Sequence, residues 1–595
     1  MQRNQIQKNF KLSGLTLEPK ALDYLQNLLT RIEPAKQSKI IVRIIDSLIN
    51  LNLENPRITL GQCEEAIKAC KTESNYESEV LKTVSAFQCP KIKFNHECKK
   101  FIFEDNKSHI LPEESLQKAN LYKNRYDIVY QSLMQSNIFK ASTGYSLSSI
   151  ESLQHVSSST KEFVVFGMLA KVGASRFILE DPSGSIDLNL ENASSHSVLC
   201  PEGCFFLVEG TVTDKTLYVS GIGLPSLFLT PYSNISSKLE TTANRQISLP
   251  DPLCNINTLN QLETLHKVMT TSQVGSDSML ILLGKVTLNG NQTMSRLIQL
   301  FNGFAATNPT AFVMYGEFIS TKTKSCSNFN TRQIKLLRGY MKNLLSIFCN
   351  AFPVAKVRPH LILIPGQNDP ILSPNRILPY APLNPECIPQ EYHQDLANPE
   401  NLFDPEIAQT YEKSKTRKWI HLGTNPLRMR IFNKTAVFFT AEYSRLFFKH
   451  SVNNPEENLF NDRSESEVYG DALIQCITSQ QHLLPLPMEI SVVHWNYDSA
   501  LSLFPGPDLV CICDPNSIFK FNQEEENENS RILFADLKTF GDIISVSNET
   551  NEDDLNRDNK PECDEEVAKQ ITFDFNFKVW YPSTSSIEDS RLPDL

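Results

Sequence analysis

Polar residues that can bind a metal ion follow several hydrophobic runs of the chain. Glu317 follows "AFVMYG", the pair Gln367 and Asn368 stands in "HLILIPGQNDP", and Asp514 follows "DLVCIC". His482 stands in "QHLLPLP". A two-metal hydrolytic centre needs carboxylates and imidazoles at several strand ends, with the ions roughly 3.5–4 Å apart. Metal-assisted hydrolysis is therefore the first chemistry to test against these residues.

The elements that must position these residues are predicted within residues 275–595. Near-continuous hydrophobic runs such as "SMLILLGKVTL" and "DLVCICD" are typical of strands that are covered on both faces. The intervening "MSRLIQLFNGF" and "QIKLLRGYMKNLLSIF" have helical periodicity. This alternation predicts an α/β layered domain. Within it, the acidic segments 522–530 and 548–568 have few hydrophobic residues, and we expect disordered surface loops there.

Aromatic and thiol side chains in "VVHWNYDSALSLFPGPDLVCICD" each have two interpretations. Cys511 and Cys513 point to the same side of a predicted strand, where they could ligate one metal ion. Small buried side chains are the commoner outcome for such cysteines. Large aromatic residues near strand ends serve either a core or an interface, and core is the commoner outcome. We expect Tyr497 and Phe504 to pack inside the α/β domain.

Short strands are predicted for residues 141–235. The runs "EFVVFGMLAKV", "RFILEDPSGSIDLNL", "CFFLVEGTVTD" and "TLYVSGIGLP" are separated by Gly, Pro, Asp and Ser. Four or five such strands predict a small Greek-key barrel of the OB type. OB barrels often bind single-stranded nucleic acid through aromatic platforms and basic grooves. Phe166 and Phe177 could serve as platforms, but these strands carry few cations besides Lys171 and Arg176, which disfavours that function.

A small all-helical unit is predicted for residues 1–75. The stretches "ALDYLQNLLTRI" and "IIVRIIDSLINL" place apolar residues at helical spacing. Thr59 and Gln62 have the spacing of a capping box at a helix start. Residues 76–140 are interpreted as a linker and irregular segment, and residues 236–274 as a connecting segment. A bundle this small on a long tether is typical of a docking module.

The composition narrows the class of protein. The 595 residues are 41% hydrophobic and 21% charged, which is typical of globular chains, and the length predicts about three or four domains. The formal charge of −11 disfavours a free-standing nucleic-acid binder, although local basic patches stay open. The start "MQRNQIQKNFKLSG" lacks the apolar core of a secretory signal, and no run is long enough to predict a membrane span. The fourteen cysteines are expected to be reduced.

Several stretches together resemble a known family. The sequences "FILEDPSGSIDLNL", "AFVMYGEFIS", "LILIPGQNDP", "QHLLPLP" and "FKVWYPSTSSIEDSRLPDL" resemble the B subunits of eukaryotic replicative DNA polymerases. The start "NFKLSGLTLEPKALDYL" resembles the N-terminal helical domain of the epsilon branch of that family. The resemblance implies a multidomain α+β chain with a helical module, an OB barrel and an inactive calcineurin-like phosphoesterase domain, in that order.

The resemblance also implies that the metal motifs of the phosphoesterase domain are degenerate. Active phosphoesterases carry Asp-x-His after the first strand, then a bridging Gly-Asp, a Gly-Asn-His-Asp or Gly-Asn-His-Glu loop, and a closing Gly-His-x-His. The corresponding positions in this chain are Gly284, Val286, Glu317, Gln367, Asn368, His482, Asp514 and Asn516. Only Glu317, His482 and Asp514 could still ligate, which allows one stray ion but no bridged pair with a general acid. We therefore expect no catalytic, cofactor or metal site, and no enzyme activity.

The function implied by the resemblance is that of a non-catalytic accessory subunit, which acts in the nucleus during chromosomal DNA replication. Its partners would be the C-terminal cysteine-rich domain of the epsilon catalytic subunit and, through residues 1–75, the GINS component of the replicative helicase assembly. DNA would be reached indirectly through the complex, and no membrane partner is expected. Two alternatives stay open: an active metallophosphoesterase, and a single-strand binder acting through the barrel. Serine-hydrolase and nucleotide-binding functions have no motif in the chain.

Overall fold

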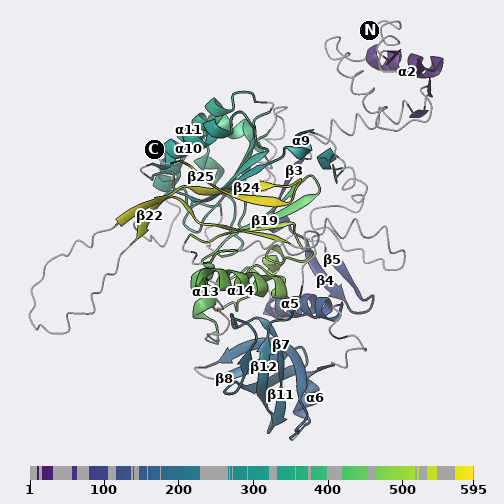
Figure 1. Ribbon diagram of the computed structural model, residues 1–595, viewed down its shortest axis with the longest axis vertical. Helices are drawn as coiled ribbons and strands as arrows, with labels where there is room; N and C mark the ends of the chain where they lie inside the picture. Colours follow the sequence, from purple (N-terminus) through teal and green to yellow (C-terminus); the bar gives the residue numbers. More distant parts are fainter. Residues whose placement is uncertain are drawn as a thin grey trace, which may run out of the picture. The chain divides into compact units, whose positions relative to one another are not determined.

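The computed structural model of the chain divides into two compact units, residues 1–82 and residues 83–595 (Figure 1). The structure describes residues 10–11, 16–30, 57–59, 61–62, 80–104, 115–135, 139, 146–156, 158–173, 176–227, 265–266, 268–270, 273–290, 292–320, 331–355, 357–372, 377–397, 418–452, 464–515, 517, 519–521, 532–545 and 570–593. The expected loops at 522–530 and 548–568, and most of the segment 236–274, lie outside the described residues. No helix in the described part of the chain is long and apolar enough to cross a membrane.

The first unit contains one long described helix that begins at Pro19, where the missing N–H costs no hydrogen bond. Leu22 and Leu25 lie three residues apart on this helix, and both are buried. The backbone N–H of Thr59 donates to Oε1 of Gln62 at 3.0 Å, as the predicted capping box requires. The described elements are α2 (Pro19–Thr30) and two short parallel strands, β1 (Thr16–Leu17) and β2 (Arg57–Ile58). The strand pair corrects the all-helical prediction.

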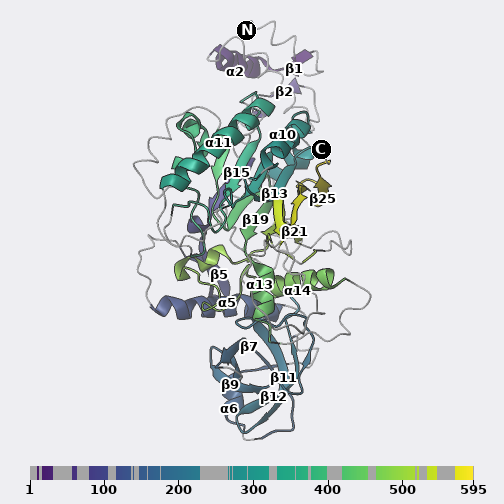
Figure 2. The same cartoon turned by 90° about the vertical axis from the view of Figure 1, so that its left-hand side faces the viewer.

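Five strands of the second unit close into a barrel. Antiparallel ladders join β12 to β11, β11 to β7, β7 to β8 and β8 to β9, and β9 closes the ring by pairing in parallel with β12 (Figure 2). The interior is filled by buried residues such as Val165, Leu169 and Phe206. This closed order is that of an OB barrel. The elements are β6 (Leu147–Ser148), α6 (Ile150–Gln154), β7 (Phe163–Val172), β8 (Arg176–Asp181), β9 (Gly184–Asn189), β10 (Ser194–Ser195), β11 (Phe205–Thr213) and β12 (Thr216–Gly223).

Residues 76–140, expected to be an irregular linker, contain regular structure instead. After the strand β3 (Leu81–Ser85), this segment contains the hairpin strands β4 (Lys91–Asn95) and β5 (Lys100–Glu104) and the helix α5 (Ser115–Gln135). The helix buries Ile128 and Leu133, and the ring of its Tyr126 lies 5.3 Å from the ring of Phe166 on the barrel. The helix therefore packs on the barrel. The prediction missed α5 because polar residues interrupt its apolar face, which weakens the helical pattern.

The larger sheet of the second unit carries the predicted polar motifs. Its strands β17, β15, β14 and β13 are neighbours in that order and run parallel. The other edge of β13 is shared, because β24 pairs with its first half and β22 with its last two residues. Helices α10 and α11 share one hydrophobic core with this sheet. The elements are α9 (Gln273–Ser276), β13 (Leu280–Val286), α10 (Thr293–Phe304), β14 (Ala311–Tyr315), α11 (Thr331–Ala351), β15 (His360–Ile364), β16 (Leu396–Ala397), β17 (Ile420–Leu422), β22 (Thr539–Ser545), β23 (Gln570–Asp574), β24 (Asn576–Tyr581) and β25 (Ser586–Arg591).

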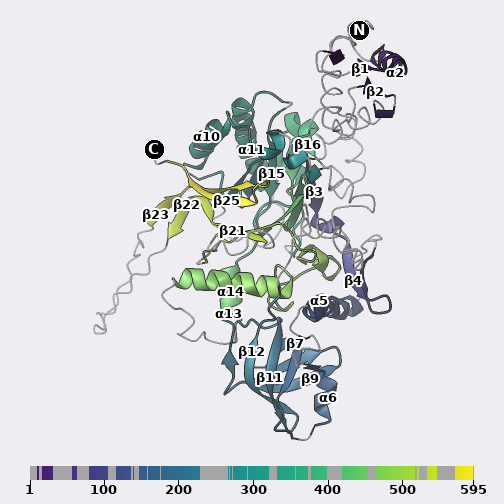
Figure 3. The same cartoon turned by 45° about the vertical axis from the view of Figure 1, so that its right-hand side comes forward.

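A second sheet, with strand order β21-β20-β19-β18-β3, packs against the first. The hydroxyl of Tyr315 on β14 donates to the backbone oxygen of Cys511 on β20 at 2.9 Å and joins the two sheets. Cys511 and Cys513 are both fully buried, as expected for small core residues. Helices α13 and α14 cover the outer face of the second sheet, which makes the domain a helix–sheet–sheet–helix sandwich (Figures 2 and 3). The elements are β3 (Leu81–Ser85), β18 (Leu427–Ile431), β19 (Lys434–Thr440), α13 (Tyr443–Lys449), α14 (Glu465–Gln480), β20 (Leu509–Cys513) and β21 (Leu533–Leu537).

The barrel and the sandwich share one hydrophobic core. Barrel residues such as Leu169 and Cys204 belong to the same buried cluster as residues of α13, α14 and β20. The sulfur atoms of Cys204 and of Cys476 on α14 are 3.8 Å apart. Figure 3 shows α14 running between the barrel and the two sheets. The barrel is therefore fixed to the sandwich by buried contacts.

Tyr497 and Phe504 are only half-buried, which corrects the expectation that both pack inside the α/β domain. The ring of Phe504 lies 4.5 Å from the ring of Phe101, and the ring of Tyr497 lies 4.9 Å from that of Phe87. Both partners belong to the segment before α5 that the sequence predicted to be irregular. The two aromatic residues hold this segment against the sandwich.

Candidate functional site

Three loops of the larger sheet bring together a lysine, a glutamate and an asparagine. Lys285 lies near the end of β13, Glu317 follows β14, and Asn368 follows β15. The Nζ atom of Lys285 is 2.7 Å from Oε2 of Glu317. The Nδ2 group of Asn368 donates to the other carboxylate oxygen, Oε1, at 2.5 Å. Both oxygens of the Glu317 carboxylate are therefore occupied by protein donors.

Asp369, the last residue of the Gly-Gln-Asn-Asp turn, forms hydrogen bonds that hold the same loops together. Its buried carboxylate accepts hydrogen bonds from the backbone N–H groups of Phe318 at 2.8 Å and Gly366 at 2.9 Å. Burial raises the pKa of Asp369 to about 7, although these two donors act to lower it. A side chain at Gly316 would begin 1.9 Å from the Asp369 carboxylate, so only glycine fits there. The loops are packed too closely to admit further side chains.

The two positions that would supply ligands after the first strand cannot do so. A Cβ atom at Gly284 would lie 1.7 Å from the backbone oxygen of Lys538, which accepts a hydrogen bond from the N–H of Lys285 at 3.0 Å. Val286 is fully buried and apolar. The register of β13 shifts between Leu283 and Lys285, an irregularity of the kind that redirects a side chain.

The remaining predicted positions do not join this cluster. Asp514, after β20, is buried and accepts from the N–H and the hydroxyl of Ser444, both at 2.9 Å, at the start of α13. Gln367 is exposed, and Asn516 lies outside the described residues. Asp514 therefore ties α13 to the second sheet and is not part of the loops around Glu317.

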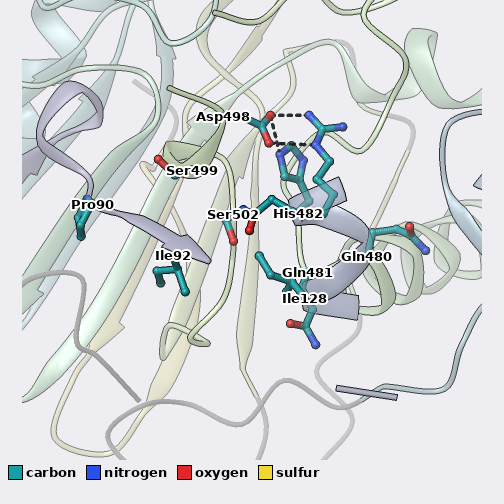
Figure 4. A pocket seen from close by; sticks show the side chains of 11 residues that line it. Pro90, Ile92, Ile128, Gln480, Gln481, His482, Asp498, Ser499 and Ser502 are labelled. Atoms are coloured by element: carbon teal, nitrogen blue, oxygen red, sulfur yellow. Dashed lines mark hydrogen bonds and ion pairs between the residues drawn. The ribbon is translucent and has the colours of Figure 1, made fainter. Parts of the chain in front are cut away.

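His482 belongs to a different buried cluster (Figure 4). Its Nδ1 accepts from the backbone N–H of Leu484 at 3.1 Å, so Nε2 carries the proton and donates to Asp498 at 3.3 Å. The guanidinium of Arg125 on α5 also binds Asp498, through Nε at 3.0 Å and through Nη2. Burial and the Arg125 cation lower the pKa of His482. Burial alone would raise the pKa of Asp498, but Arg125 and His482 together hold it well below its usual range.

The cavity beside His482 is too small for a substrate. Its volume of about 20 Å³ for a water-sized sphere gives room for one water molecule. Ligand pockets for small molecules are typically about 300–1,000 Å³. The Arg125–Asp498–His482 group therefore links α5 to the turn after α14 and to the 3-10 helix Trp495–Ala500, and it is a structural cluster.

The structure thus brings together Glu317 and Asn368 of the predicted positions and separates His482 and Asp514 from them. Within the described residues, no three His, Cys, Asp or Glu side chains are placed to hold a metal ion. Sequence interpretation missed Lys285, which lies between the two predicted motif positions Gly284 and Val286. The available signal was that Lys285 is the one charged residue in the hydrophobic run "SMLILLGKVTL".

Comparisons with known families match three consecutive parts of the chain. Residues 279–520 match the family of B subunits of DNA polymerases alpha and epsilon. Residues 115–226 match "DNA polymerase epsilon subunit 2-like, OB-fold domain", which confirms the OB barrel and groups α5 with it. Residues 2–70 match "DNA polymerases epsilon N terminal". The chain belongs to the family of B subunits of the replicative DNA polymerases.

Within this family the chain is of the epsilon type, as relatives over its full length show. "DNA polymerase epsilon subunit 2" of Mus musculus is 26% identical over 99% of this chain and 98% of the relative. The proteins of the same name from Homo sapiens and Drosophila melanogaster are also 26% identical, over 99% and 100% of this chain and 98% of each relative. The chain is therefore similar over its full length to the second subunit of DNA polymerase epsilon, which places it in DNA replication.

We predict that Lys285→Met destabilises the fold because it leaves the Glu317 carboxylate without its cation. The two side chains are 26% and 23% exposed. The loss should therefore lie between about 0–1 kcal/mol for an exposed pair and about 3–5 kcal/mol for a buried one. The double variant Lys285→Met/Glu317→Gln should regain part of that loss. Thermal unfolding of Lys285→Met, Glu317→Gln and the double variant checks this, and strictly additive losses would contradict the ion pair.

We also predict a pH-dependent contribution to stability from Asp369. Its pKa is about 7 in the folded chain and 3.8 as the ordinary value, so folding takes up a proton between these values. The contribution is fully present below pH 3.8 and is lost as pH rises through about 7. Asp369→Asn cannot titrate, so wild type should lose melting temperature relative to this variant between about pH 5 and pH 8. The control is Asp214→Asn, at an exposed position. A difference in melting temperature between wild type and Asp369→Asn that does not change with pH would contradict the raised pKa of Asp369.

Proposed function

We propose that this chain is a non-catalytic scaffold within the DNA polymerase epsilon complex. It holds the catalytic subunit through the barrel and the layered domain, and it links that subunit to the replicative helicase assembly through residues 1–75. The domain at 275–595 is a phosphoesterase-like domain that has lost its metal centre. Membership in the epsilon B-subunit family supports the catalytic subunit as a partner and the nucleus as the location.

The contact between Lys285 and Glu317 carries the proposal that the centre is inactive. In a two-metal site, a carboxylate after the second strand would face divalent cations. Here that carboxylate faces an ammonium group at 2.7 Å and the amide of Asn368. A divalent ion would have to displace a cation that is held by the chain itself, against Coulomb repulsion. The Lys538 carbonyl beside Gly284 leaves no room for the missing ligand.

The arrangement of the sheets supports the phosphoesterase-like assignment. Two packed sheets with helices on both outer faces form the sandwich, and the degenerate motifs follow successive parallel strands β13, β14 and β15. The carboxyl ends of such strands are where α/β folds place their ligand sites. The layered domain therefore has the architecture for a metal centre without its ligand set.

The distribution of the hydrophobic core supports the two docking roles. Barrel and sandwich share one core, so together they offer a continuous surface for the cysteine-rich C-terminal domain of the catalytic subunit. Residues 1–82 form a compact unit of their own, which suits an independent contact with the GINS component of the helicase.

Two features of the barrel argue against the alternative of a single-strand binder. Phe166 is 2% exposed and packs against Tyr126 of α5 and against Phe205, so it cannot offer its face to a base. Arg176 is paired with Asp187 at 2.6 Å, which neutralises one of the few cations on these strands. The other alternative, an active metallophosphoesterase, lacks the required set of ligands.

We predict that the purified chain does not hydrolyse a phosphodiester such as bis-(p-nitrophenyl) phosphate in the presence of manganese. The physical reason is the paired Glu317 and the lack of an imidazole in the turn before Asp369. Release of nitrophenol is measured against a buffer blank. Turnover that is abolished by Glu317→Gln or by His482→Ala would overturn the proposal.

We predict that deletion of residues 1–75 leaves binding of the catalytic subunit intact and weakens binding of GINS. A cut at this point spares β3, which pairs with β18 in the second sheet. The full chain and the truncated chain are each co-expressed with the C-terminal domain of the catalytic subunit and sized by gel filtration. They are then tested for capture of recombinant GINS. Loss of the catalytic-subunit complex on truncation would show that the scaffold extends into residues 1–75.

A further inference from the structure

Positive charge is concentrated in one part of an otherwise acidic chain. Residues 278–368 contain ten Lys or Arg and one carboxylate, Glu317, for a formal charge of +9. Since the whole chain carries −11, the remaining residues together carry −20. The members of this group that reach solvent make the local potential more positive than that of the rest of the molecule. The segment covers β13, β14, β15 and the helices α10 and α11.

The helix α11 presents the largest share of this charge to solvent. Its 21 residues include four cations and no carboxylate, at Arg332, Lys335, Arg338 and Lys342. Spacings of three and four residues place Lys335, Arg338 and Lys342 on one side of the helix. From Arg332 to Lys342 the row is about 15 Å long at about 1.5 Å per residue. We call these four residues the cationic face of α11.

The cationic face points away from the core. Leu337, Met341, Leu344 and Phe348 on the opposite side of α11 are fully buried against the larger sheet. Arg332, Lys335 and Lys342 are exposed and Arg338 is half-buried. Figure 2 shows α11 on the outer side of β15, away from the second sheet.

The charges of two lysines of the cationic face are not compensated by a described residue. Lys335 and Lys342 form no ion pair with a described residue. Arg338 donates through Nε to the backbone oxygen of Glu386 at 2.5 Å. This hydrogen bond orients the guanidinium group but does not neutralise its positive charge. The backbone of Glu386 therefore lies beside the row, and its side chain is exposed. A row of exposed cations, two of which have no ion pair with a described residue, favours an anionic partner.

We propose that the cationic face of α11 binds the phosphate backbone of duplex DNA. The choice of DNA rests on the family, whose members work in DNA replication, while the site rests on the charge and geometry of α11. An acidic protein partner is disfavoured because stable protein interfaces have an apolar core. The face has one strongly exposed apolar side chain, Leu336, at 49%. Contacts of this kind carry no base specificity and position the polymerase complex on DNA.

The salt dependence of binding measures the number of phosphates contacted. Each neutralised phosphate of B-DNA contributes about −0.9 to the slope of log K against log salt concentration. Three or four contacts from the cationic face predict a slope of about −3. Loss of Lys335 and Lys342 should leave a slope of about −1 and weaken binding at about 50 mM salt by at least about tenfold.

The experiment uses the full chain and a fluorescein-labelled duplex of about 20 base pairs, with anisotropy measured from about 50 to 200 mM NaCl. The test variant is Lys335→Glu/Lys342→Glu, and Lys335→Gln/Lys342→Gln should have an intermediate effect. The matched control is Lys161→Glu/Lys215→Glu, which makes the same change in net charge at two exposed lysines of the barrel region. Because all four lysines are exposed, the melting temperatures of the variants should equal that of wild type.

Binding that weakens in the α11 variants and not in the barrel control supports the proposal. Equal weakening in both double variants would show that only net charge matters, and the site on α11 would be wrong. Absence of duplex binding by wild type at about 50 mM salt would also overturn it. Labelled polyglutamate is the last probe. If it binds wild type, fails to bind the α11 variant and is not competed by duplex, the partner is an acidic protein and the DNA proposal falls.

Discussion

The close approach of the Lys538 carbonyl to β13 is the constraint on which the central loops depend. At this point β13 changes partner from β24 to β22, and the carbonyl accepts the N–H of Lys285 at 3.0 Å. Position 284 must be glycine, because a Cβ atom there would lie 1.7 Å from the carbonyl oxygen of Lys538. One backbone contact therefore excludes a ligand side chain at Gly284. It also fixes the backbone from which Lys285 reaches the carboxylate of Glu317.

The polar groups that remain in the loops satisfy one another. A buried or half-buried carboxylate is costly unless it is paired or accepts hydrogen bonds. Glu317 meets this requirement with an ammonium and an amide, and Asp369 meets it with two backbone N–H groups. In an active centre, metal ions would supply part of this compensation. Here donors of the chain itself supply it to Glu317 and Asp369.

Much of the architecture could be predicted from the sequence because its signals are local. Continuous apolar runs reveal the strands of the sandwich, and alternating runs with turn residues reveal the barrel. The segregation of His482 from Glu317 could not be predicted, because it depends on the contact of His482 with Asp498 and on Arg125, which is remote along the chain. The helix α5 was missed because its weak periodicity becomes meaningful only when the barrel surface is present. Lys285 was missed because its role depends on the carboxylate opposite.

The shared core gives the layered domain a structural role. Cys204 of the barrel and Cys476 of α14 are in contact inside a cluster that extends to β20, so the barrel cannot move independently of the sandwich. The outer surfaces of the two parts are thereby held in one fixed relation. A partner that contacts both parts binds two surfaces whose relative position is already fixed, and this preorganisation increases its affinity. The sandwich then serves as a rigid support, and its outer helices carry surface charge.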